Sequence, residues 1–420
     1  MANTTQQTQT AQNRVGVAGA EARRLLEEYG ADPLHFFALL PDKRYLLSGP
    51  GEPEWGMAYR VVGRQALALG DPFGSPNTAP EAVASFAALC RRQGWKPVWY
   101  QTTGASLDTY RRAGLQVVKV GEDAQISLAD FSLAGKKYVK MRNDLRRIEK
   151  AGVVLETYGP DAPPTAECTA EMDAISRGWR KAHNANEGWF AMGGFDPQSR
   201  LFAESRYFVA RDTGTGRMLA FTSFVPIFGA GTAHGWTLDL MRRQANALHG
   251  VMDFLIVSAA SQFAAEGAQM LSLGLSPLAG DDDPREAAAT SHIRRFLYTR
   301  LNRAYNFQGL HTFKAKFATH WEARYLVYPG RLALASASGA VLKAHLTPPS
   351  SAKPKQVWHV RSSQRRAFVL CALVLLGLAP FEKTLAKRAA AHPAHWSHLR
   401  PLSYAHLNLH HLKFSRSPRV

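Results

Sequence analysis

Cysteine is scarce in this sequence, and the spacing of the few cysteines excludes several kinds of protein. Only Cys90, Cys168 and Cys371 occur among 420 residues, and no two of them form a CxxC pair. A disulfide framework and a cysteine-based metal site are therefore not expected, and a reducing compartment such as the cytosol suits the chain best.

Long apolar runs are scarce as well. The first twenty residues are polar and lack an apolar core, so we expect neither a signal peptide nor an N-terminal membrane anchor. The apolar run at 367–379 is shorter than the roughly twenty residues that a membrane-spanning helix needs. We expect a packed or interfacial helix there.

Acidic residues are few relative to basic ones, most of all near the C-terminus. The net charge is +18, from 51 Lys and Arg against 33 Asp and Glu. From Lys343 onward, 13 basic residues face the single acid Glu382, so this tail contributes +12 and the rest of the chain +6. Such a balance favours a polyanionic partner, either nucleic acid or anionic lipid.

Hydrophobic patterning predicts two α/β series joined by a basic helix. In the first, strands precede a helix near 80–94 and a strand near 96–102; in the second, strands from 153 onward precede a helix near 251–267 and a strand at 270–277. Between them, Tyr138, Met141, Leu145 and Ile148 form the apolar stripe of a helix over 136–152.

The segment HGWTLDLMRR (234–243) draws attention because a carboxylate interrupts a strand. Strict alternation would place Trp236, Leu238 and Leu240 on one face and Asp239 on the other. The order strand, loop, helix, strand is typical of GNAT acyltransferases, where the helix N-terminus binds a pyrophosphate. The loop RRQANALHG lacks the small residues of the usual coenzyme A loop, which argues against that cofactor.

Several segments together resemble one family. These are GDPFG (70–74), KMRNDLRRIEKAG (140–152), GFDP (194–197), WTLDLMRR (236–243), GVMDFLIVSAA (250–260), LSLGLSPLAG (271–280) and YNFQGLHTFKAKFATHWEARYLVYPG (305–330). In this order they resemble the cytoplasmic catalytic domain of the aminoacyl-phosphatidylglycerol synthases, also called multiple peptide resistance factors. The family's membrane flippase domain has no counterpart in these segments.

The resemblance implies a tandem pair of GNAT-like folds that moves an aminoacyl group from charged tRNA to a glycerol hydroxyl of phosphatidylglycerol. It implies no metal or small cofactor, and a cytoplasmic enzyme at the inner face of the cell membrane. The expected organisation is a disordered leader (1–20), a first half (21–135), the basic helix (136–152), a second, catalytic half (153–335) and a basic His-rich tail (336–420).

Asp239 and Arg242 are the expected catalytic pair. Asp239 would hold the ammonium of the aminoacyl group, and Arg242 would hold a phosphate or an ester oxygen. The alternative is a structural ion pair between the two. In FKAKF (313–317), read as strand-like, Lys314 and Lys316 share a face and would flank a substrate phosphate, or else form a solvated face.

The remaining candidates each have a structural alternative. Glu322 and Arg324 would close the same cavity or form a rim salt bridge, and Asn306 would bind substrate or cap a turn. Ser272 and Gly274 suit a strand whose backbone lies close to a ligand. Candidate contacts to tRNA or lipid, otherwise a solvated face, are Lys136, Lys140, Arg142, Arg146, Arg147 and Lys150.

Two other functions remain open from the sequence. One keeps the fold but changes the substrates, as in an acetyl-coenzyme A-dependent GNAT enzyme or a peptidoglycan-bridge aminoacyltransferase. The other is a non-catalytic protein that binds tRNA or lipid through its charge.

Overall fold

The computed structural model describes residues 18–49, 51–75, 77–129, 131–183, 187–277 and 307–348, all within one compact unit. The expectations for residues 1–17, for Asn306 and for the tail beyond 348 lie outside the described residues.

The described chain is built on one twelve-stranded mixed sheet, in the order β1-β2-β3-β5-β12-β6-β11-β10-β9-β8-β7, with β4 paired to β2. The strands are β1 Arg44–Leu47, β2 Trp55–Val62, β3 Gln65–Leu69, β4 Phe73–Gly74, β5 Lys96–Thr103, β6 Gln116–Ser127, β7 Val153–Tyr158, β8 Arg206–Asp212, β9 Met218–Gly229, β10 Thr232–Arg243, β11 Met270–Pro277 and β12 His320–Tyr328.

The same small unit occurs twice in this sheet. Strands β3 and β5 are parallel neighbours joined through helix α2 (Ala79–Gln93), and β10 and β11 are parallel neighbours joined through helix α7 (Val251–Ala265). In both units an antiparallel strand precedes the parallel pair. This repeated unit confirms the expected mixed α/β class, and we call the strands β1–β6 and β7–β12 the first and second series.

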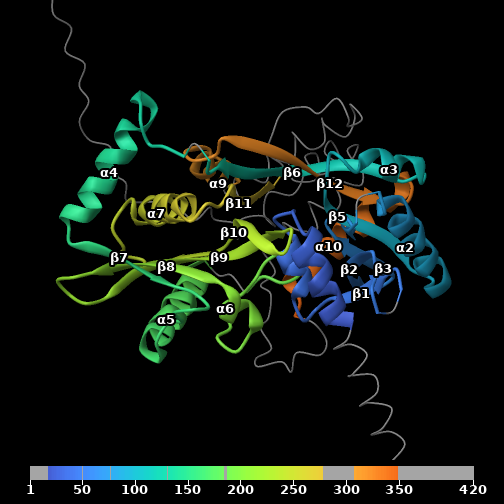
Figure 1. Ribbon diagram of the computed structural model, residues 1–420, viewed down its shortest axis with the longest axis horizontal. Coiled ribbons are helices and arrows are strands. Elements are labelled where there is room, and N and C mark those ends of the chain that lie inside the picture. Colours follow the sequence, from blue (N-terminus) through green and yellow to red (C-terminus); the bar gives the residue numbers. More distant parts are fainter. Residues whose placement is uncertain are drawn as a thin grey trace, which may run out of the picture. The chain divides into compact units, whose positions relative to one another are not determined.

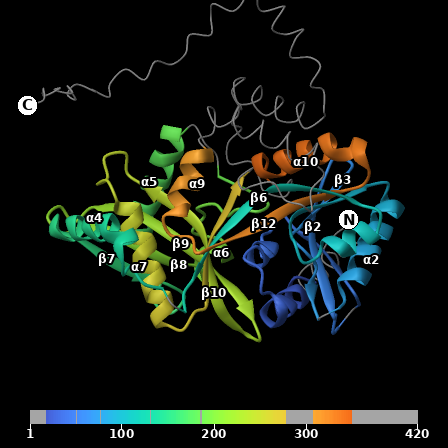
Figure 2. The ribbon, with the colours of Figure 1, turned by 90° about the horizontal axis from the view of Figure 1, so that it is seen from above.

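Each series contributes its last strand to the part of the sheet that the other series forms. Strand β12 pairs with β5 of the first series, and β6 pairs with β11 of the second, while β6 and β12 also pair with each other. Figure 2 shows these two strands crossing between the helices α2 and α10 on one side and α4, α5 and α7 on the other. The two series therefore share a hydrogen-bonded ladder as well as side-chain contacts.

Helices cover both faces of the second series. Helices α5 (Ala166–His183) and α6 (Arg200–Glu204) lie on one face of β8–β10, and α7 lies on the other with α4 (Val139–Lys150) beside it (Figure 1). The stripe expected on the basic helix packs as predicted, because Met141 and Ile148 are buried in the core under α7 and Tyr138 and Leu145 pack against it.

The core beneath α7 is rich in aromatic rings. Phe263 meets Phe208 and Phe224 edge-on at 5.3 and 5.4 Å between centroids, and stacks on Trp236 at 4.7 Å. Edge-to-face and stacked rings add to the free energy gained from burial alone.

The folded body extends beyond the expected boundary at residue 335. Helix α10 (Leu334–Leu346) packs Ala337, Ala340 and Ala344 into a core that includes Leu67 and Leu326. The guanidinium of Arg60 donates to the carbonyl oxygens of Ala344 and Thr347 at the end of this helix. Alanine gives a weak hydrophobic signal, which is why the sequence pattern fades before the helix does.

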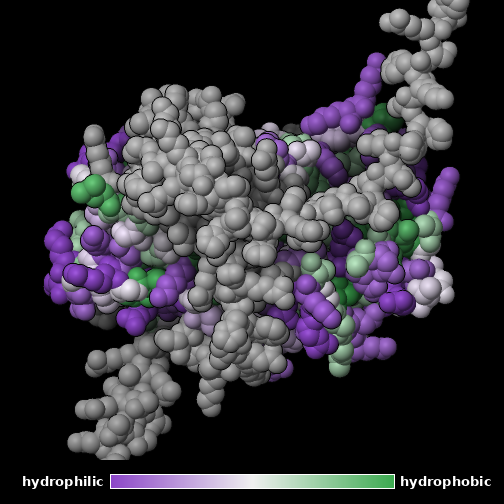
Figure 3. Space-filling view, turned by 180° about the vertical axis from the view of Figure 1, so that it is seen from behind, coloured by the Kyte–Doolittle hydropathy of each residue, from purple (hydrophilic) through white to green (hydrophobic). Residues whose placement is uncertain are grey.

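On the face in Figure 3, hydrophobic residues form only small areas among hydrophilic ones. Within the described ranges, no helix has the length and apolar character needed to cross a bilayer.

Replacing Phe263 with alanine should destabilise the fold by about 3–5 kcal/mol, because a fully buried ring that contacts three others leaves a cavity. Urea unfolding followed by circular dichroism measures this. Val154→Ala, at a side chain that is 42% exposed, is the control and should change the free energy of unfolding by less than about 0.5 kcal/mol.

Candidate active site

A β-bulge in β10 produces the central feature of the candidate site. Leu238 pairs with Phe224 of β9 and Leu240 pairs with the next residue, Ser223, so Asp239 is an extra residue in the ladder. The hydroxyl of Ser223 accepts the Leu240 amide at 3.1 Å. Bulges redirect the side chains that follow them, and they are frequent beside active sites.

The bulge changes which residues share a face, so strict alternation along 236–241 is wrong. Leu238 belongs to the core under α7, whereas Leu240 belongs to the core under α5, and Met241 returns to the α7 side. As a result Asp239 and Arg242, three residues apart, both reach toward the segment containing α5 and α6. In a regular strand, residues three apart point to opposite faces.

The absence of a side chain at Gly193 makes room for the carboxylate of Asp239. Its Oδ1 accepts the backbone amide of Gly193 at 2.8 Å. A Cβ at Gly193 would lie 2.5 Å from Asp239 Oδ2 and 2.5 Å from Leu201 Cδ2, so only glycine fits. Burial raises the pKa of Asp239 to about 7, although the Gly193 amide and the Arg242 charge pull it down. A half-buried carboxylate that has no cation within ion-pair distance among the described residues is suited to bind one.

Arg242 is held by an aromatic ring and an acid. Its guanidinium lies 4.0 Å from the ring centre of Trp179 on α5, and Nη2 donates to Glu187 Oε2 at 3.3 Å. Glu187 also pairs with Arg180 at 3.1 Å. No ion pair joins Asp239 and Arg242 among the residues that the structure describes, so the structural alternative of a direct pair is wrong.

The segment 187–195 carries both partners and is held from the first series. Within it, Phe190 is fully buried at φ 71°, a left-handed conformation that a phenylalanine seldom adopts. Lys43, before β1, donates to the Phe190 carbonyl at 2.8 Å, and the Phe190 ring contacts Tyr100 of β5 and His345 of α10. Residues of the first series thus maintain the strained segment that binds Asp239 and Arg242.

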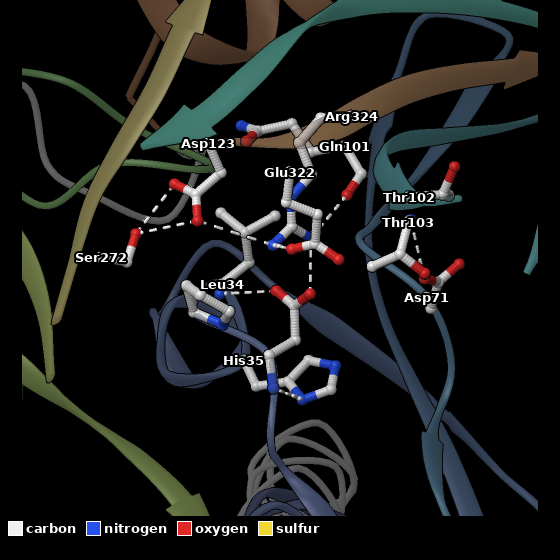
Figure 4. Close-up of polar contacts among 12 residues, drawn as sticks. Leu34, His35, Asp71, Gln101, Thr102, Thr103, Asp123, Ser272, Glu322 and Arg324 are labelled. Atoms are coloured by element: carbon white, nitrogen blue, oxygen red, sulfur yellow. Dashed lines mark hydrogen bonds and ion pairs between the residues drawn. The ribbon is translucent and has the colours of Figure 1, made fainter. Parts of the chain in front are cut away.

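A second polar cluster surrounds Arg324, where β12, β6 and β11 meet (Figure 4). Its guanidinium lies 2.5 Å from Asp32, 2.7 Å from Glu322 and 3.8 Å from Asp123, and it is 1% exposed. Ser272 donates to Asp123 at 2.8 Å. The structure therefore brings Ser272 and the ion pair of Glu322 with Arg324 together, with Arg324 buried and the Glu322 side chain 32% exposed.

This cluster has more acid than base. Three carboxylates face one guanidinium, with the Lys314 ammonium also near Asp123, and burial is the main reason that the pKa of Glu322 is raised. The side-chain amide of Gln125 donates to both Asp123 and Glu322 at 3.0 Å. Such an excess of carboxylate is stabilised further when a cation binds nearby.

The strand-like interpretation of FKAKF is wrong. Residues 313–315 end helix α9 (Phe307–Ala315), so Lys314 and Lys316 do not share a strand face. Buried Lys314 donates to the carbonyls of Gly274 and Leu275 at 2.8 and 2.9 Å, and burial lowers its pKa to about 8. Lys316 pairs with Asp253 of α7 at 2.8 Å. These partners leave no phosphate site between the two ammonium groups.

Ser272 and Gly274 lie where β11 itself is irregular. The pairing of β11 with β6 shifts between Ser272 and Leu275, and Gly274 has φ 79°. The Gly274 amide donates to Ser272 Oγ at 3.0 Å. Parallel pairing of β10 with β11 ends at Thr237 and Ser272, so the strands part just before Asp239.

The cations of α4 are largely exposed, apart from Arg142, which donates to the carbonyls of Leu133 and Gly135. Lys140 and Arg147 both pair with Asp144, at 2.8 and 3.2 Å. Arg147 Nη2 also donates to the carbonyl of His249, in the loop between β10 and α7. Lys136, Arg146 and Lys150 are exposed as well.

Comparison with known proteins identifies the family. Residues 23–328 match the family model described as phosphatidylglycerol lysyltransferase, C-terminal. The chain belongs to this family. The resemblance of its motifs is thereby confirmed.

The relatives agree with this assignment. A phosphatidylglycerol lysyltransferase of Bacillus subtilis is 27% identical over 72% of this chain, and the bifunctional protein LysX of Mycolicibacterium gilvum is 28% identical over 77%. The chain covers 34% and 29% of these proteins, so it spans about a third of the curated relatives it matches.

Two solved structures share the fold. One is the C-terminal domain of an Agrobacterium fabrum protein described as a lysylphosphatidylglycerol synthetase, with TM-score 0.66 and 28% identity, covering 78% of this chain and 97% of that one. The other is L-PGS from Bacillus licheniformis, with TM-score 0.65 and 25% identity, covering 77% and 95%.

In this member of the phosphatidylglycerol lysyltransferase family, several residues of the candidate site are not predicted by the sequence pattern. Asp123 interrupts the apolar alternation of β6 just as Asp239 interrupts β10, so the same signal would have found it. Asp32, Glu187 and Trp179 carry no such signal, because they lie in loops or on a helix. Among described residues, no group of three or more His, Cys, Asp or Glu is placed to hold a metal ion.

Gly193→Ala should destabilise the protein by about 1–3 kcal/mol, because the new methyl group overlaps Asp239 and Leu201. Urea unfolding tests this. Gly339→Ala in α10, where a Cβ meets nothing within 4 Å, is the control and should be neutral or slightly stabilising. Equal stability of the two variants would contradict the tight pocket.

Asp239→Asn should change how stability depends on pH. Since the folded pKa of Asp239, about 7, exceeds the ordinary value of 3.8, the native protein binds this proton more tightly than the unfolded chain does. Wild type should lose stability relative to Asp239→Asn as pH rises from about 4 to 7, with no further change above. Unfolding titrations from pH 5 to 8 test this, and the control Asp173→Asn, which retains Asp239, should follow the wild-type trend.

Proposed function

We propose that this chain transfers an aminoacyl group from aminoacyl-tRNA to a hydroxyl of phosphatidylglycerol, as a peripheral protein at a membrane surface. The observation that carries the proposal is the placement of Asp239 and Arg242 on one face of a bulged strand, in a chain of the phosphatidylglycerol lysyltransferase family.

The proposed reaction requires the protein to position its two substrates more than to activate them. An aminoacyl ester is already reactive, so the protein must align two substrates and stabilise the oxyanion that forms at the carbonyl. Asp239 holds the α-ammonium, whose charge also lowers the raised pKa of this carboxyl. Arg242, held over the ring of Trp179, donates to the carbonyl oxygen as negative charge develops.

The acid-rich cluster supports a lysyl group over an alanyl group. Thr237 and Ser272 pair between β10 and β11, so the Arg324 cluster, reached through Ser272, lies near the point from which Asp239 projects. The three carboxylates of that cluster suit the distal ammonium of lysine, whereas alanine offers only a methyl group to them. The names of the curated relatives agree with this choice.

The exposed charge of α4 suits both anionic partners. Ammonium and guanidinium groups reach solvent from Lys140, Arg146, Arg147 and Lys150 of α4, whose apolar side packs into the core, and from Lys136 in the 3-10 turn before it. Such a surface attracts RNA and anionic lipid alike, and its attraction weakens with salt.

Asp239→Asn should lower transfer from lysyl-tRNA to phosphatidylglycerol vesicles by at least about a hundredfold while tRNA binding persists, because only the ammonium contact is lost. Wild-type kcat/KM should rise with pH through about 7, as Asp239 ionises, and the variant should lose this rise. Chromatography of labelled lipid measures the transfer.

The controls separate this proposal from its rivals. Asp173→Asn, which removes an acid from the outer side of α5, should transfer at the wild-type rate. Alanyl-tRNA should be a poorer donor than lysyl-tRNA. A wild-type protein that transfers neither amino acid to the lipid, with both tRNAs charged and the vesicles accessible, refutes the proposed function.

A further inference from the structure

A pocket lies beside the candidate site, on the α5 side of β10. Its volume is about 520 Å³, within the range of ligand pockets. The lining residues are Ala174, Ile175, Gly178, Trp179, Ala182 and His183 of α5, Arg217 before β9, and Arg243, Gln244, Ala245 and Asn246 at the end of β10 and in the loop that follows. None of these lining residues is acidic.

One wall of the pocket is aromatic. The rings of Trp179 and His183 are stacked at 4.4 Å between centroids with an angle of 22° between their planes. His183 is exposed and Trp179 partly so. Flat, partly exposed rings next to cations are how proteins hold the bases of single-stranded nucleic acid, because every base offers a π-face.

The opposite wall is cationic and polar. Arg217 and Arg243 are both exposed. Arg217 is oriented by a hydrogen bond of 3.3 Å that its Nη2 donates to Oε1 of Gln244. A guanidinium matches the geometry of a phosphodiester. The pocket thus combines a stacking surface with phosphate donors.

Trp179 connects this pocket to the reacting groups. It lines the pocket and also supports Arg242, which follows Asp239 on the same face of β10. In an aminoacyl-tRNA, the ester joins the amino acid directly to the ribose of the terminal nucleotide. An ammonium on Asp239 and a carbonyl at Arg242 therefore direct that ribose toward Trp179.

The charge continues beyond the pocket. The loop that supplies Asn246 runs on to His249, whose carbonyl accepts Arg147 of α4. A polyanion that ends in the pocket can leave along this loop over the exposed cations of α4. A phospholipid headgroup has no base to stack and no further phosphates to follow that path.

We propose that the pocket between α5 and the loop 243–246 binds the 3′-terminal nucleotide of the aminoacyl-tRNA, with its base on the exposed ring of His183, which stacks on Trp179, and its phosphate at Arg217 and Arg243. The donor then enters from the α5 side of β10. This inference rests on the proposed function and adds the site and direction of donor binding to it.

The test compares two RNAs on full-length protein: an acceptor-stem minihelix with a complete 3′ end, and the same RNA without its terminal nucleotide. Fluorescence anisotropy gives the Kd values. Wild type should bind the complete RNA about tenfold more tightly. His183→Ala and Arg217→Ala should each lose most of this difference and bind the shortened RNA as wild type does. Arg177→Ala, on α5 but outside the pocket, should keep the full preference.

Turnover supplies the second readout. His183→Ala and Arg217→Ala should raise the KM for charged tRNA about tenfold, with kcat and the KM for phosphatidylglycerol close to wild type. A raised lipid KM would instead assign the pocket to the headgroup and overturn the proposal. So would equal binding of the two RNAs by wild type, or equal losses on both RNAs in the variants.

The two proposals fail separately. The binding experiment needs no transfer, so a protein that distinguishes the two RNAs through His183 and Arg217 but transfers nothing refutes only the proposed function. A protein that transfers lysine but binds both RNAs equally refutes only the nucleotide pocket.

Discussion

The β-bulge at Asp239 is the constraint on which the candidate site depends. Without the extra residue, Asp239 and Arg242 would face opposite sides of the sheet, one toward α7 and the other toward α5. With it, the Asp239 carboxylate and the Arg242 guanidinium lie on the same face of the sheet. They are nevertheless too far from each other to form an ion pair. Each keeps a different protein partner, Gly193 or Glu187, and so retains capacity for a substrate group of opposite charge.

The sheet explains why two α/β series are needed around one site. Because β12 joins β5 and β6 joins β11, the Arg324 cluster is assembled from strands of both series and a loop of the first. The segment 187–195 is likewise held in a left-handed turn at Phe190 by Lys43 and Tyr100. The first series therefore shapes the candidate site through the positions of residues in the second.

Much of this arrangement could be predicted from residue patterns. The period of Tyr138, Met141, Leu145 and Ile148 is a local property, and α4 packs as that period requires. Asp239 was conspicuous because an acid inside an apolar strand is costly to bury without a partner. The strand-like interpretation of FKAKF is wrong because five alternating residues are too short a window to separate a strand from the last turn of a helix. The boundary expected at 335 leaves out most of α10, because three of the four buried residues of that helix are alanine.

Local periodicity, or one residue out of place, is enough to predict the mixed α/β class, the amphipathic basic helix and the acid in β10. The bulge, the exchange of β6 and β12, the partners of Arg242 and Arg324, and the pocket beside Trp179 are set by the folded chain as a whole. These depend on contacts between residues far apart in the chain, such as Asp32 with Arg324 and Lys43 with Phe190, and no local pattern encodes which distant partner a buried charge will find.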